Sequence, residues 1–114
     1  MPSAAQSHAI SSAIASIRAA ENALLNQGRQ TTNALVAAKI SNEYNSLDSV
    51  LTQLIQAQVI ADDATFQTAA TALQQESAIL DTQAAAISQV IKDVATAAQI
   101  AGYIAQAATA VAAL

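Results

Sequence analysis

Apolar residues recur at steps of three and four along nearly the whole chain, and this period constrains the fold more than any other feature. One stripe runs from Ile10 to Ile55, and a second begins at Phe66. Such spacing places apolar side chains on one face of an α-helix, which turns once every 3.6 residues. Two glycines and one proline in 114 residues interrupt it rarely. Alanine, the best helix former, is abundant, so the sequence predicts an all-α protein.

The clearest interruption is VIADDATF, residues 59–66. Asp62 or Asp63 can cap a new helix there, because a carboxylate accepts backbone N–H groups and meets the positive end of the helix dipole. We therefore predict a single helical domain, residues 1–114, with a helix at about 3–58, a turn at about 59–63 and a helix at about 64–114. The two helices have similar lengths, which favours a long antiparallel, coiled-coil-like hairpin.

Gly28 leaves an alternative open in the first half. The segment LLNQGRQTT could end one helix at Gly28, with Thr31 or Thr32 capping the next. A continuous helix with a kink or break at Gly28 is favoured, because it matches the second helix in length. Glycine costs about 1 kcal/mol relative to alanine inside a helix.

The side chains in the predicted contact seam between the helices change in size along its length. Large residues lie near the turn and alanines lie toward the chain ends, where small side chains allow close helix packing. The predicted seam comprises Leu47, Leu51, Leu54, Phe66, Leu73, Leu80, Ile87, Ile91, Val94, Ala98, Ala101 and Ala105.

A two-helix rod has no true interior, and apolar positions remain off the stripe. Chains that cannot bury enough apolar surface alone usually associate. We therefore expect the hairpin to complete a four-helix or larger bundle by pairing with copies of itself. Charged residues make up only 11% of the chain, so that its polar faces repel one another weakly.

The residues that carry chemistry are few. The net charge is −4 and the four basic residues are scattered, which excludes a phosphate-binding stripe and therefore nucleic acid. There is no cysteine, and the single histidine, His8, has no carboxylate within a helical turn to share a metal. The ten serines lack a paired base. We expect no catalytic residue, no metal, no cofactor and no enzyme activity.

These features favour a non-enzymatic structural or interaction protein whose partner is itself, with a protein encoded nearby as a second candidate partner. Residues 95–114 carry no charge and approach the length that spans a bilayer, although few of them are large and apolar. The alternative is therefore a membrane-active component of a multi-component α-helical pore-forming system acting through this segment. The N-terminal residues do not resemble a signal peptide, so a cytoplasmic location is the default, with signal-less export as the alternative.

Overall fold

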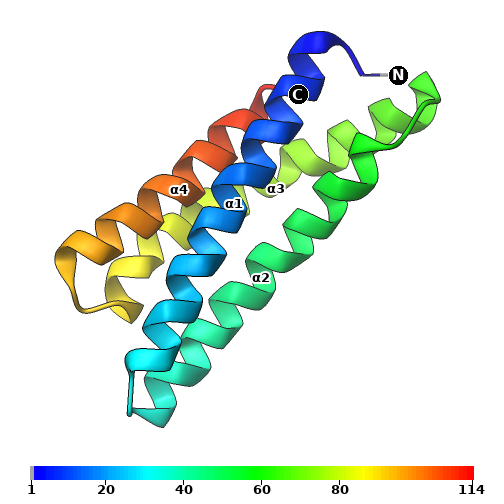
Figure 1. Ribbon diagram of the computed structural model, residues 1–114. Helices are drawn as coiled ribbons and strands as arrows, with labels where there is room; N and C mark the ends of the chain where they lie inside the picture. The colour runs from blue at the N-terminus through cyan, green and yellow to red at the C-terminus, as the bar shows by residue number, and fades with distance from the viewer. Residues whose placement is uncertain (1) are drawn as a thin grey trace.

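Residues 2–114, the range that this computed structural model describes, form four α-helices and contain no strand. The helices are α1 (Ala4–Gln30), α2 (Ala34–Gln58), α3 (Asp63–Val90) and α4 (Val94–Ala112). Each runs antiparallel to the helix before it, and α4 returns to pack beside α1 (Figure 1). The α2–α3 contact is the least extensive of the four between neighbouring helices. The all-α prediction is confirmed.

A side chain caps the start of every helix in this range. Ser3 and Gln6 form a reciprocal capping box at α1, and the Asn33 side chain accepts the N–H groups of Leu35 and Val36 at α2. Asp62 and Asp93 each accept a backbone N–H three residues ahead, from Thr65 at 2.8 Å and Thr96 at 2.9 Å. These bonds satisfy donors that have no partner within the helix.

The predicted long helices are both interrupted, so the two-helix hairpin is wrong. The first breaks at residues 31–33 and the second at residues 91–93, where the caps Asn33 and Asp93 start new helices. Gly28 is not the break, because it lies inside α1, where an added Cβ would be 3.6 Å from Ile40 Cγ2. The cap side chains compete with helix continuation by bonding the backbone locally.

Breaking both helices lets one chain close its own core. A 51-residue helix over 64–114 would be about 75 Å long, whereas the folded chain extends 47 × 20 × 18 Å. Every helix now packs against two neighbours instead of one. A second copy is therefore not needed to complete the bundle, which corrects that part of the prediction. Fully buried side chains from all the helices form one core, among them Ile17, Leu54, Phe66 and Ile104.

The break at residues 91–93 also changes which face of α4 is buried. The extended residues before Asp93 shift the helical phase, so that α4 buries Ala97, Ile100, Ile104, Ala107, Ala108 and Val111. The predicted stripe through Ala98 and Ala105 is exposed instead. At the far end of α4, the Gln6 side chain donates a hydrogen bond to the Leu114 carbonyl at 3.1 Å, joining the first turn of α1 to the C-terminal end.

The observed helical phase of α4 predicts where this helix tolerates a charged side chain. Ala107→Glu should destabilise the fold by more than about 3 kcal/mol, because Ala107 is fully buried and the change adds overpacking and an unpaired charge. Ala105→Glu, on the exposed face of the same helix, should change stability by less than about 0.5 kcal/mol. Thermal and urea unfolding of both variants measures the difference. Equal effects would contradict the observed phase.

Candidate functional site

The residues of the predicted seam separate into two groups in the structure. Those before the second break lie in the core: Leu47, Leu51, Leu54, Phe66, Leu73, Leu80, Ile87 and Ile91. Beyond the break, Val94, Ala98 and Ala105 are exposed and Ala101 is half-buried. Asp62 is the N-cap of α3, and Asp63 is the acidic residue in its first turn. The core group packs within the chain, so any interaction surface lies on other residues.

The most exposed large apolar side chains in residues 2–114 lie at the two ends of the bundle. Val94 is 81% exposed, Val59 80% and Leu35 76%. Val94 follows the cap Asp93 directly, and one residue separates Leu35 from the cap Asn33. Both lie at the end where the α1–α2 and α3–α4 loops lie together (Figure 1). Val59 is the C-cap of α2 and begins the turn at the opposite end. We name these the loop-pair end and the single-turn end.

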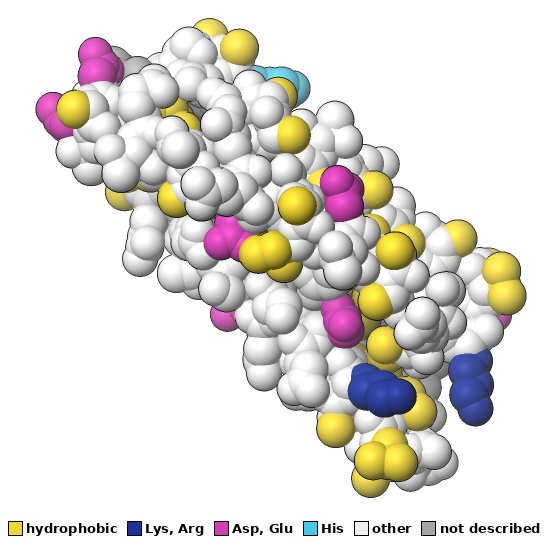
Figure 2. All heavy atoms as spheres, turned by 180° about the vertical axis from the view of Figure 1, so that it is seen from behind, with side chains coloured by type: hydrophobic (Ala, Val, Ile, Leu, Met, Phe, Trp, Pro, Cys, Tyr) yellow, Lys and Arg dark blue, Asp and Glu magenta, His cyan; other side chains and the backbone are white. Residues whose placement is uncertain are grey.

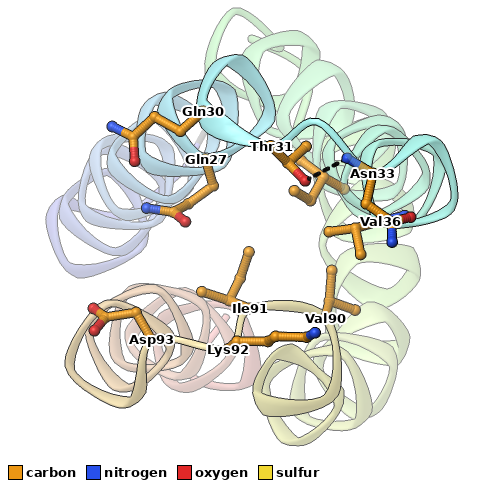
Figure 3. A pocket seen from close by; sticks show the side chains of 10 residues that line it. Gln27, Gln30, Thr31, Asn33, Val36, Val90, Ile91, Lys92 and Asp93 are labelled. Atoms are coloured by element: carbon orange, nitrogen blue, oxygen red, sulfur yellow. Dashed lines mark hydrogen bonds between the residues drawn. The ribbon is translucent and has the colours of Figure 1, made fainter.

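A hollow of about 290 Å³ opens at the loop-pair end. Its apolar lining comes from Val36 and Ile40 of α2 and from Val90 and Ile91, where α3 passes into its loop. Figure 3 shows Ile91 and Val90 rising from that loop toward the α1–α2 loop, with Gln27 reaching in from α1. The remaining lining residues are Gln30, Thr31, Asn33, Lys92 and Asp93. An apolar floor with a polar rim is the usual anatomy of a small docking site.

The two ends carry opposite charge. The basic residues at or near the loop-pair end are Arg29, in the last turn of α1, Lys39 and Lys92. Asp93 also lies there, and its carboxylate caps α4 by accepting the Thr96 N–H. The single-turn end carries Asp62 and Asp63. On the face drawn in Figure 2, basic side chains gather near one end, and acidic side chains lie at the other and along the middle. Hydrogen bonds from Thr65 lower the pKa of Asp62, and those from Thr96 lower the pKa of Asp93, so both stay ionised.

A buried carboxyl group, that of Glu21 in α1, lies beside the exposed Asp48 of α2. Glu21 is only 5% exposed, and its Oε2 atom has no hydrogen-bond partner. Burial, a hydrogen bond with Asp48 and the Asp48 charge raise the pKa of Glu21 to about 7, against the attraction of Arg18. The negative charge of Glu21 in turn raises the pKa of Tyr44, with burial and Asp48 adding to it. The carboxyl group lies inside the helix interface, beside Asp48 and Arg18.

A second polar layer lies between α2 and α3. The Gln83 amide donates to the Glu43 carbonyl at 2.8 Å, while Gln83 Oε1 and Glu43 Oε2 are buried without partners. Farther along, the Gln53 amide donates to Glu76 at 3.3 Å. Buried polar groups that lack partners reduce stability. Their position agrees with the limited contact between these two helices.

Two further kinds of site are a metal centre and a membrane-spanning helix. In residues 2–114, no three His, Asp or Glu side chains are grouped so as to hold a metal ion. One helix in that range, α4, is long and apolar enough to cross a membrane by length and composition alone, with a mean hydropathy of 1.2.

Neither protein-family models nor curated proteins nor solved structures gave a match to this chain.

Sequence reasoning missed both Glu21 and the two ends. Glu21 falls on the apolar stripe at a position normally given to Leu or Ile, and that is the signal that it is buried. The stripe pattern includes Val94 because the break at residues 91–93 is not predicted, and the break before Leu35 is predicted only as the alternative at Gly28. An apolar residue directly after a cap residue, as in Asp93-Val94, is the pattern that identifies an exposed first turn.

The raised pKa of Glu21 predicts a specific pH dependence of stability. Its folded pKa of about 7 exceeds the ordinary value of 4.5, so the folded state holds a proton that the unfolded state loses. The stabilisation is fully present below pH 4.5 and is lost as the pH rises to about 7.

Glu21→Gln removes this titration while keeping the size and the hydrogen-bonding group. Relative to wild type, the variant should therefore gain stability as the pH rises from 4.5 to 7. Asp81→Asn, at an exposed position of α3, is the matched control and should run parallel to wild type. Urea unfolding at several pH values measures both. A constant difference between Glu21→Gln and wild type would contradict the assignment.

Proposed function

We propose that this chain is a non-enzymatic structural protein that works by associating with other copies of itself. The observation that carries the proposal is the concentration of exposed apolar side chains at the two ends: Val59 at one, Leu35 and Val94 at the other. Scattered single apolar residues are ordinary on a protein surface. Three that are more than three-quarters exposed and confined to the ends of a rod are a pattern that end-to-end contact accounts for.

Surface charge supports the same proposal. The chain has only 12 charged residues other than His8, and its sides are covered mainly by Gln, Ser, Thr and Ala. Such surfaces repel one another weakly when copies approach. Side-by-side pairing has less apolar surface available, because Val90, Ile100, Ile104 and Val111 are buried within one chain and Ile79 is the exposed exception among these off-stripe positions of α3 and α4.

The small area of each end limits the affinity of one copy for the next. The bundle measures 20 × 18 Å across, so one end offers much less than the ~800 Å² per partner of a standard stable interface. Association through the ends should therefore be weak for a single contact and should depend strongly on concentration.

Sedimentation velocity of the purified chain from the micromolar to the millimolar range tests the proposal. We expect the weight-average mass to rise with concentration well beyond one chain. High salt should weaken association where end charges contribute, because exposed ion pairs are screened. A folded monomer over the whole range would overturn the proposal.

A second candidate function rests on α4. Its nineteen residues carry no charge and meet the length and hydropathy of a membrane span. Its large apolar side chains, Ile100, Ile104 and Val111, face the core, so insertion would require the bundle to open. Liposome flotation and dye leakage with the chain alone, and with proteins encoded beside its gene, test this candidate. Absence of both flotation and leakage would remove it.

A further inference from the structure

The single-turn end presents a small apolar projection of fixed shape. Val59 is 80% exposed, and the backbone there is held by hydrogen bonds from Val59 N to Gln56 O at 3.3 Å and from Ile60 N to Ala57 O at 3.2 Å. Asp62 then caps α3. A side chain on a hydrogen-bonded turn loses little freedom on binding, which favours it as a contact point.

The loop-pair end presents a hollow whose shape is complementary to this projection. Its hollow has a volume of about 290 Å³, far above the ~10–15 Å³ that one water needs. Val36, Val90 and Ile91 line it, and Lys92 lies at its edge (Figure 3). The acidic pair Asp62-Asp63 beside Val59 has the opposite sign to Lys92. Charges of opposite sign around an apolar contact fix its orientation and register.

We propose that copies of this chain associate head to tail, with the Val59 turn of one copy seated in the loop-pair hollow of the next. This inference rests on the proposed function, self-association, and assigns the two surfaces that perform it. The contact is heterologous, because it joins two different patches. The patches lie at opposite ends of a 47 Å rod, so each added copy leaves a free turn and a free hollow. Linear growth follows unless the rotation closes a ring.

Two variants block one surface each. Val59→Glu places a carboxylate where the apolar turn would enter the hollow and next to Asp62, and should weaken self-association more than about tenfold. Gln27→Trp fills the hollow from α1, since Gln27 reaches into it, and should have the same effect. Lys92→Glu, in the loop, tests the charge at the same end without adding bulk. Ile79→Glu, at a 56% exposed position on the side of α3, is the matched control and should associate like wild type.

The decisive experiment mixes the two blocked variants. Val59→Glu keeps an intact hollow and Gln27→Trp keeps an intact turn, so each should be monomeric alone and the mixture should form dimers but nothing larger. Sedimentation velocity measures the sizes, and circular dichroism checks that each variant is folded. If Gln27→Trp fails to fold, Lys92→Glu replaces it in the mixture.

The outcomes separate the two proposals. Association of wild type that Val59→Glu leaves unchanged would overturn the head-to-tail contact while leaving self-association standing. Two variants that stay monomeric when mixed would overturn the heterologous geometry. Contact between like ends would instead let one of the two variants associate by itself, which would overturn it as well. A wild-type monomer at every concentration would overturn both proposals.

Discussion

Side-chain oxygens of Asn33 and Asp93 accept backbone N–H groups at the starts of α2 and α4, and the two short loops that they close determine the shape of the whole chain. Each cap offers the backbone a local partner in place of the helical one, so the chain can turn at modest cost. Two turns of this kind convert a thin rod into a bundle in which every helix has two neighbours. They also bring both loops to one end, where the hollow between them forms.

The buried polar groups show where the bundle gives up stability. Glu21 and Asp48 join α1 to α2, and Gln83 and Glu43 join α2 to α3, so α2 has a polar contact on both sides. Apart from Ala, the buried residues of α4 are Ile100, Ile104 and Val111, and none of its buried residues is polar. Removing water from a carboxyl costs free energy, and the proton kept by Glu21 reduces that cost. We therefore expect α2 to separate first from the remaining helices when the bundle opens.

The sequence predicted helix content well and helix number poorly, for one physical reason. The 3.6-residue period continues through both breaks, so Ile87, Ile91, Val94 and Ala98 look like one stripe. The period reports which face is apolar but says nothing about whether Asp93 bonds the backbone or points to solvent. At residues 59–63, by contrast, two adjacent aspartates broke the pattern visibly, and α2 ends at Gln58 with α3 starting at Asp63. The core residues Leu47 to Ile91 could be read from the stripe, whereas the candidate site at the ends depended on the missed breaks.

The ends of a bundle are where such a chain can carry specificity without losing stability. Along the sides, every helix must keep one face apolar for the core, and the other face here is mainly small and polar with few charges. At the ends, the side chains that follow each cap are free of that requirement, because the first turn projects beyond the core. Leu35, Asp63 and Val94 occupy such positions, and Val59 and Lys92 lie in the connections between helices. Folding therefore does not require these few residues for the core, and in the proposed head-to-tail contact the opposite charges at the two ends would give the assembly one direction along the rod.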